Sequence, residues 1–364
     1  MTGIYIHIPF CKTKCPYCDF YSFKPDNTQK DSYLKAVLLC IEQHSKKIRD
    51  SVDTVYFGGG TPSFFGGERL KKVISCIKEN YNIKDAEITV ECNPSSVDSE
   101  LLFHLKQAGV NRISMGMQSA VDKERTALGR LSDRQQVKKA VSLIKNHGIT
   151  NISLDLMLGI PHQTKESLRE SLDFIISCGV THVSAYMLKI EEGTPFSKTE
   201  LPLPDEDEVC ELYLFASDYL EEKGFAQYEI SNFAKKGFES RHNLKYWKCE
   251  DYLGIGPSAH SFIGGERFYY PRDFASFLTD PATVSDGKGG DEEEYIMLAL
   301  RLSEGLLKDK YFRRYGKEIP AEIFRKAELF EKNGLVKITD KGIRLTKKGY
   351  LLSNSIITEF LSWS

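Results

Sequence analysis

The stretch Cys11-Lys12-Thr13-Lys14-Cys15-Pro16-Tyr17-Cys18 decides the fold, because it follows an alternating apolar run that predicts a buried strand. Its spacing places three thiols on one short loop at the end of that strand. Three sulfurs can hold a cubane iron–sulfur cluster and leave one iron open, whereas a structural zinc ion takes four protein ligands. A zinc site with His7 as fourth ligand, or three unligated thiols, are the alternative interpretations of the residues alone.

The first part of the chain, residues 1–224, repeats a strand, a polar loop and an amphipathic helix six times. Strands are expected at 4–10, 52–57, 86–92, 112–117, 152–158 and 182–187, and helices at 33–45, 67–81, 99–108, 133–146, 165–178 and 206–223. This alternation implies parallel strands with right-handed crossovers, and six units are two short of a closed barrel. We therefore predict an α/β fold, a partial (β/α)6 TIM-like barrel.

The remainder of the chain predicts a connecting segment at 225–290 and a small C-terminal α+β domain at 291–364. Helices at 291–302 and 319–333, a hairpin at 335–346 and a helix at 347–361 give a winged-helix-like pattern. Basic and acidic residues are mixed throughout this segment, and the net charge of the chain is -2. We therefore expect no nucleic-acid partner.

Composition and cysteine usage point to a reducing compartment. The chain has nine cysteines in 364 residues, and the six outside the first loop are scattered without paired spacings. No apolar run approaches the length of a membrane span, and the N-terminus leads directly into the cysteine loop. We expect a cytoplasmic protein without a transmembrane segment, and peripheral membrane contact stays open.

Polar residues follow several of the predicted strands at the edge where a parallel sheet places its chemistry. The glycine turn after the second strand exposes backbone N–H groups, and carboxylates or amides within apolar strands need partners. Each of these features also has a purely structural interpretation: the glycines can form a simple turn, and the polar side chains can make buried hydrogen bonds within the protein. The candidates are Gly59, Gly60, Thr61, Glu91, Gln118 and Asp155.

The cysteine spacing resembles the signature of the radical S-adenosylmethionine (SAM) superfamily. The flanking sequences, Tyr5 to Cys11 and Pro16 to Phe20, are similar to its coproporphyrinogen oxidase and haem chaperone branch. The resemblance implies a 4Fe-4S cluster on Cys11, Cys15 and Cys18, whose free iron binds SAM. It further implies SAM contacts at Tyr5, Tyr17, Gly59, Gly60, Thr61, Glu91, Gln118, Arg130 and Asp155, of which Gln118, Arg130 and Asp155 contact a second SAM in the oxidase.

The segment His242-Asn243-Leu244-Lys245-Tyr246-Trp247 resembles the haem-binding motif of HemW-type chaperones, which implies His242 as an axial haem ligand. Two departures separate the chain from the oxidase pattern: Phe20 stands where the oxidase has a fourth cysteine, and ten residues precede Cys11. The resemblance therefore favours a haem chaperone over an oxygen-independent coproporphyrinogen III oxidase. The partners it implies are haem, a haem-acceptor protein and a reductant such as flavodoxin or ferredoxin, while enzymatic turnover stays undecided.

Overall fold

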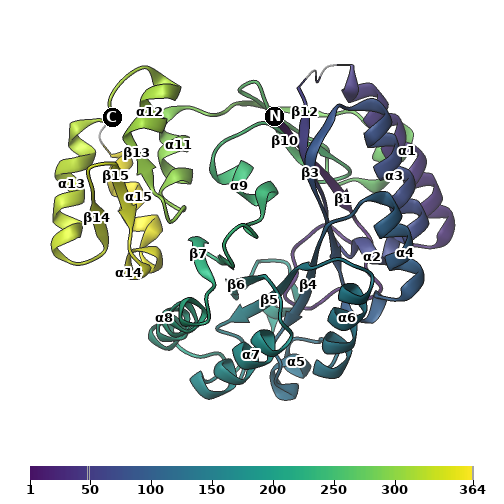
Figure 1. The fold of residues 1–364 in the computed structure, drawn as a ribbon, viewed down its shortest axis with the longest axis horizontal. Helices are drawn as coiled ribbons and strands as arrows, with labels where there is room; N and C mark the ends of the chain where they lie inside the picture. Colours follow the sequence, from purple (N-terminus) through teal and green to yellow (C-terminus); the bar gives the residue numbers. More distant parts are fainter. Residues whose placement is uncertain (47, 49, 363–364) are drawn as a thin grey trace.

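The computed structural model describes residues 1–46, 48 and 50–362, and it contains a twelve-stranded curved sheet with a separate three-stranded sheet near the C-terminus (Figure 1). The order of the large sheet is β12-β11-β10-β9-β1-β2-β3-β4-β5-β6-β8-β7. Strands β1 to β6 lie side by side in sequence order, and each pairs in parallel with the next. The predicted open barrel of six βα units is therefore confirmed.

The six strands of the barrel carry alternating helices on their outer side. The strands are β1 (Thr2–Ile8), β2 (Val52–Gly59), β3 (Ile83–Cys92), β4 (Arg112–Gln118), β5 (Asn151–Leu158) and β6 (His182–Met187). The helices are α1 (Asn27–Ser45), α2 (Pro62–Phe65), α3 (Gly67–Asn80), α4 (Ser99–Ala108), α5 (Asp122–Ala127), α6 (Arg134–Asn146), α7 (Lys165–Ser177) and α8 (Glu206–Glu222). Among the described residues, no helix is both long and apolar enough to cross a membrane.

Two of the predicted boundaries differ for local reasons. Strand β1 ends at Ile8 because Pro9 has no N–H to donate, and Phe10 makes only an isolated bridge to Phe23. Helix α1 begins at Asn27, six residues earlier than predicted, because Asp26 caps it and Gln29 closes a capping box. The capping residues give the helix a start that apolar periodicity alone does not reveal.

The segment after α8 extends the sheet at both edges, which the sequence did not predict. It contains β7 (Ala226–Glu229), β8 (Asn232–Ala234), α9 (Arg241–Trp247), β9 (Tyr252–Ile255), β10 (His260–Ile263), β11 (Glu266–Tyr269), α10 (Phe274–Thr279) and β12 (Val284–Lys288). Strand β9 pairs in parallel with β1, and β8 pairs antiparallel with β6. Each of these strands has only three to five residues, too few for a clear alternation pattern.

The C-terminal part packs beside the barrel, with α9 between them (Figure 1). Its elements are α11 (Glu292–Ala299), β13 (Leu306–Leu307), α12 (Lys308–Tyr315), α13 (Ala321–Lys332), β14 (Val336–Ile338), β15 (Gly342–Leu345), α14 (Lys347–Leu351) and α15 (Ser353–Leu361). The predicted helices and hairpin are present, and α12 and β13 are additional. Backbone hydrogen bonds join it to β7, from Ser303 N–H to Tyr228 O at 3.0 Å. The division at residues 224 and 290 stays a prediction.

An aromatic cluster packs beneath the start of the cysteine loop. The fully buried ring of Phe10 lies 5.2 Å from the Tyr33 ring and 5.6 to 5.8 Å from the rings of Phe23, Phe65 and Phe274. Tyr33 also donates a hydrogen bond from its hydroxyl to His7 O. These contacts join α1, α2 and α10 to the end of β1, so the loop begins from a fixed point.

Replacing Phe10 with alanine is therefore expected to lower the free energy of unfolding by about 3–5 kcal/mol, the usual cost of removing a buried aromatic ring. The matched control is Phe20→Ala on the same loop, where the side chain is 67% exposed; this change is expected to alter stability by less than about 0.5 kcal/mol. Urea denaturation of the metal-free proteins measures both. Equal effects of the two substitutions would contradict the assigned role of the Phe10 cluster.

Candidate cofactor site

The three cysteines of the loop come together on one wall of a cavity of about 390 Å³ at the carboxyl ends of the barrel strands. The loop is held at its start by a hydrogen bond from Cys11 N–H to Phe23 O at 2.9 Å, and it turns where Cys18 N–H donates to Cys15 O at 3.1 Å. All three thiols are partly exposed and free of disulfide bonds. A sulfur-only set of three donors that leaves the rest of the cavity open fits an iron–sulfur cluster with one free iron.

His7 does not join these thiols, which removes the zinc interpretation that relied on it. Its Nδ1 lies 3.0 Å from the Tyr5 hydroxyl, and its Nε2 lies 2.9 Å from Tyr21 O. The side chain is buried, which lowers the pKa of the imidazole to about 4, and it does not line the cavity. Within residues 1–46, 48 and 50–362, no three His, Cys, Asp or Glu side chains are arranged to hold a single metal ion.

The glycine turn after β2 is bonded directly to the cysteine loop. Gly60 N–H donates to Ile8 O at 2.8 Å, and Thr61 N–H donates to Phe10 O at 2.7 Å. The Thr61 hydroxyl also lies 3.5 Å from Cys11 Sγ. A Cβ atom on Gly60 would lie 2.7 Å from Phe10 O, closer than backbone atoms tolerate, so only glycine allows this approach. The turn and the loop therefore act as one unit.

Two carboxylates, from the strands on either side of β4, face the cavity. Glu91 at the end of β3 accepts a hydrogen bond from the Tyr56 hydroxyl at 2.7 Å, and Asp155 of β5 accepts one from the Ser114 hydroxyl at 3.2 Å. Burial raises the pKa of Glu91 to about 7, and burial likewise raises the pKa of Asp155. Ionising these carboxyl groups in the cavity costs free energy because they lose contact with water. A positively charged ligand group would offset that cost, so the cavity favours such a ligand.

Arg130 reaches the cavity from the segment between α5 and α6. Its guanidinium donates to Gly116 O and lies 3.5 Å from Cys15 Sγ. Gln118 also points into the cavity, with a φ of 71° at a register shift between β4 and β5. A residue held in this left-handed region is strained and depends on its surroundings.

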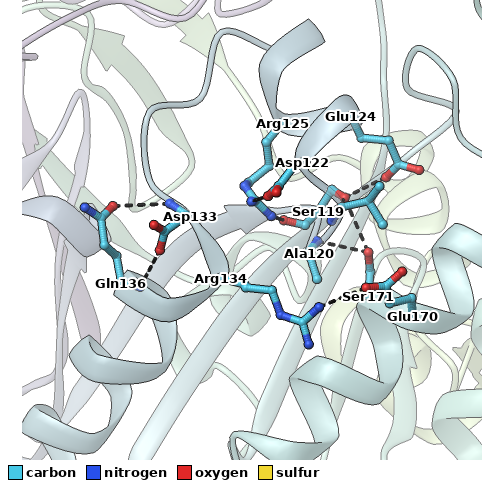
Figure 2. A network of polar contacts seen from close by, with 11 residues as sticks. Ser119, Ala120, Asp122, Glu124, Arg125, Asp133, Arg134, Gln136, Glu170 and Ser171 are labelled. Atoms are coloured by element: carbon cyan, nitrogen blue, oxygen red, sulfur yellow. Dashed lines mark hydrogen bonds and ion pairs between the residues drawn. The ribbon is translucent and has the colours of Figure 1, made fainter.

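A polar network holds the segment that carries these two residues (Figure 2). The Ser119 hydroxyl donates to Glu124 Oε2 at 2.6 Å, and Ala120 N–H donates to the Ser171 hydroxyl at 3.0 Å, which ties the end of β4 to α5 and α7. At the start of α6, Gln136 N–H donates to Asp133 Oδ1 at 2.7 Å. The network fixes both ends of the segment, and Arg130 lies between them.

Most of the site residues expected from the sequence line this one cavity: Tyr17, Gly59, Gly60, Thr61, Glu91, Gln118, Arg130 and Asp155. The structure does not bring Tyr5 or His242 to it. The Tyr5 hydroxyl bonds to His7, and its ring stacks at 6.4 Å on that of His242. Both residues lie within the barrel instead of at its rim.

His242 is buried with both ring nitrogens in use. Its Nδ1 lies 2.8 Å from the Thr54 hydroxyl, and its Nε2 lies 2.8 Å from the Tyr246 hydroxyl. Burial, with Lys245 and Arg112 nearby, lowers the pKa of the imidazole to about 3, so the ring is neutral. Axial ligation of an iron by His242 stays a prediction, and in this conformation it requires the ring to leave Thr54 or Tyr246.

Several cavity residues were not anticipated from the sequence: Tyr56, Arg112, Ser114, Ser184, Tyr186 and Asn243. Arg112 is 1% exposed, and its Nε and Nη1 have no hydrogen-bond partner among the described residues. The sequence did contain a signal for Arg112, because it is a charged residue at the first position of an otherwise apolar strand. Asn243 borders the cavity while the preceding His242 points elsewhere, which only the orientation of α9 reveals.

Comparisons with known proteins agree with this geometry. Residues 5–175 match the radical SAM superfamily, and residues 292–352 match the HemN C-terminal domain. The heme chaperone HemW of Bacillus subtilis (strain 168) is 34% identical over 99% of both chains. HemW of Mycobacterium tuberculosis (strain ATCC 25618 / H37Rv) is also 34% identical, over 99% of this chain and 94% of its own. In fold, the chain resembles the coproporphyrinogen III oxidase HemN of Escherichia coli, with a TM-score of 0.86, 22% identity and coverage of 100% and 90%.

The raised pKa of Glu91 has a consequence for stability. Its value of about 7 in the folded state exceeds the ordinary 4.5, so the carboxyl costs no stability at low pH and destabilises the fold increasingly between about pH 4.5 and 7. Glu91→Gln is expected to raise the stability of the cofactor-free protein at pH 8 by roughly 1–3 kcal/mol, and to have little effect at pH 4.5.

Thermal unfolding across this pH range tests the expectation, with the exposed Glu100→Gln as the matched control. The assignment is wrong if Glu91→Gln shifts the melting temperature equally at both pH values, because a titrating group must make the effect depend on pH.

Proposed function

The chain belongs to the radical SAM superfamily and, within it, to the HemW family, and we propose that it is a haem chaperone that binds haem and transfers it to acceptor proteins. The observation that carries the proposal is the 34% identity to the heme chaperone HemW of Bacillus subtilis across 99% of both chains. That match includes the C-terminal part and the segment with His242. Phe20, at the position where the oxidase pattern has a fourth cysteine, supports the same choice.

The proposal includes two resident cofactors in the cavity, a 4Fe-4S cluster and SAM. Cys11, Cys15 and Cys18 would hold the cluster, whose chemistry when bound is to supply one electron to the sulfonium of SAM. The turn formed by Gly59, Gly60 and Thr61 borders the cavity beside the cysteine loop, and the two glycines would leave room there for SAM. The ionised Glu91 carboxylate would accept hydrogen bonds from the SAM ammonium, and Arg130 beside Cys15 would contribute positive charge close to the cluster.

The partners follow from the same proposal. Haem and a haem-acceptor protein are the cargo and its destination, and a reductant such as flavodoxin or ferredoxin would supply electrons to the cluster. The site of action would be the cytoplasm. The alternative, an oxygen-independent coproporphyrinogen III oxidase, needs turnover of SAM, and the haem experiment below separates it from the chaperone.

The two cofactor assignments can be tested separately. Replacing Cys11, Cys15 or Cys18 singly with alanine should abolish iron and acid-labile sulfide in anaerobically reconstituted protein, whereas Cys210→Ala, outside the cavity, should retain both. Glu91→Gln should keep the cluster but weaken SAM binding roughly 10- to 100-fold in calorimetry, because it loses a charge-assisted hydrogen bond. Full iron content in a cysteine variant would contradict the cluster assignment.

Haem binding is tested by an anaerobic titration followed at the Soret band. The parent is expected to bind haem stoichiometrically. If His242 supplies an axial ligand, His242→Ala should weaken binding or shift the band, and Tyr246→Phe should strengthen it by freeing Nε2. Identical spectra and affinities in all three proteins would exclude His242 as the ligand. If the parent shows no saturable haem binding, the oxidase becomes the favoured function, and decarboxylation of coproporphyrinogen is the next assay.

A further inference from the structure

Two strongly exposed apolar side chains lie beside the cysteine loop. Among the large apolar side chains of the described residues, Leu131 and Phe20 are the most exposed, at 80% and 67%. Leu131 borders a hollow of about 360 Å³ together with Thr13 and Cys15, and Phe20 borders the cofactor cavity together with the same two residues. Single exposed apolar side chains are common on protein surfaces, but two beside one loop indicate a contact surface.

The segment that carries Leu131 is held in place on both sides. Arg130 N–H donates to Arg125 O at 2.9 Å, and the Ser132 hydroxyl donates to Asn93 Oδ1 at 3.1 Å. The exposure of Leu131 is therefore not that of a loose loop. An apolar side chain on a fixed backbone loses little conformational entropy when a partner covers it, so Leu131 is well placed for contact with another molecule.

The tip of the cysteine loop is positively charged. Lys12 and Lys14 are both exposed, and within the described part of the chain neither has a carboxylate within 4.0 Å. Asp19, directly after the loop, is paired with Arg272, with 3.7 Å between Oδ2 and Nη1. Asp98, on the border of the outer hollow, caps α4. The loop thus presents a net positive charge to solvent, which fits a negatively charged partner.

The position of this surface indicates what the partner does. The three thiols proposed to hold the cluster are partly exposed, and they belong to the loop whose tip carries Lys12 and Lys14. A protein docked there has its redox group close to the cluster, whereas a haem-acceptor protein needs no access to these thiols. Transient electron-transfer complexes bury small interfaces, and charge speeds their association. Two lysines beside two apolar contacts match such a complex.

We propose that a small acidic protein, a one-electron carrier, docks on the surface formed by Lys12, Lys14, Phe20 and Leu131. The inference rests on the proposed 4Fe-4S cluster and adds the place where its reductant binds. After docking, the reduced carrier loses one electron to the cluster, and no bond forms or breaks. The apolar pair supplies buried contact area, and the two lysines steer the carrier and select for its negative charge.

The test measures binding of two acidic carriers, a flavodoxin and a ferredoxin, to the full-length reconstituted protein. All proteins are oxidised, so no electron moves and calorimetry reports binding alone. Lys12→Glu/Lys14→Glu should weaken binding roughly tenfold or more at about 50 mM salt, and by less at about 300 mM, because salt screens the charges. Leu131→Ser should weaken binding about threefold to tenfold at both salt concentrations, because it removes apolar contact and leaves every charge in place.

Matched controls make the same changes away from the docking surface. Lys236→Glu/Lys332→Glu reverses the charge of two exposed lysines, and Leu329→Ser shortens an apolar side chain that is 61% exposed. Lys236 follows β8, and the other two residues lie on α13. All control variants should bind the carriers as the parent does. Iron and sulfide content, and reduction by dithionite, which needs no docking surface, show that each variant holds its cluster.

Each outcome bears on one proposal. Binding of a carrier with unchanged affinity in both Lys12→Glu/Lys14→Glu and Leu131→Ser overturns the docking surface and leaves the cluster and the chaperone function standing. Failure of the parent to bind either carrier also overturns it, and vesicles of anionic lipid are then the probe for the same lysines. A parent that holds no iron or sulfide after reconstitution instead overturns the cofactor proposal on which the docking surface rests.

Discussion

The backbone hydrogen bonds between the cysteine loop and the glycine turn are the constraint on which the rest of the site depends. They continue the pairing of β1 and β2 past the ends of both strands, from Gly60 to Ile8 and from Thr61 to Phe10. The approach is close enough to exclude any side chain at residue 60. The start of the cysteine loop is thus fixed against the turn before any cofactor enters, and preorganised ligand groups lose little entropy when a cofactor binds.

The cavity beside this unit is costly to maintain without a ligand. It contains the buried carboxylates of Glu91 and Asp155, and Arg112 has two nitrogens without partners among the described residues. Groups of this kind destabilise a fold unless something pairs with them, so their presence at a parallel-strand edge points to binding, not to packing. The aromatic cluster around Phe10 is on the opposite side of the same loop and supplies the stability that such a site lacks.

The sequence predicted the parts of the molecule that have strong local patterns. The six βα units were recognisable because buried parallel strands alternate with amphipathic helices, and eight of the ten expected cofactor contacts line one cavity because strand ends converge at one rim. The strands β7 to β12 were missed because each is short and depends on edge pairing with distant segments. The orientations of Tyr5 and His242 could not be predicted either. They depend on hydrogen bonds between side chains of β1, β2 and α9, which are far apart in the sequence.

Helix α9 has seven residues, and hydrogen bonds of His242 with Thr54 and Glu87 anchor it to the barrel. Glu87 accepts its first N–H groups from the barrel side, while its last residues contact the C-terminal part. Asn243 and Trp247 lie about one helical turn apart, or about 6 Å along the helix axis, so a helix this short holds them at a fixed separation. Because one short helix carries both residues, a displacement of α9 at the cofactor cavity would also displace the surface that it presents to the C-terminal part.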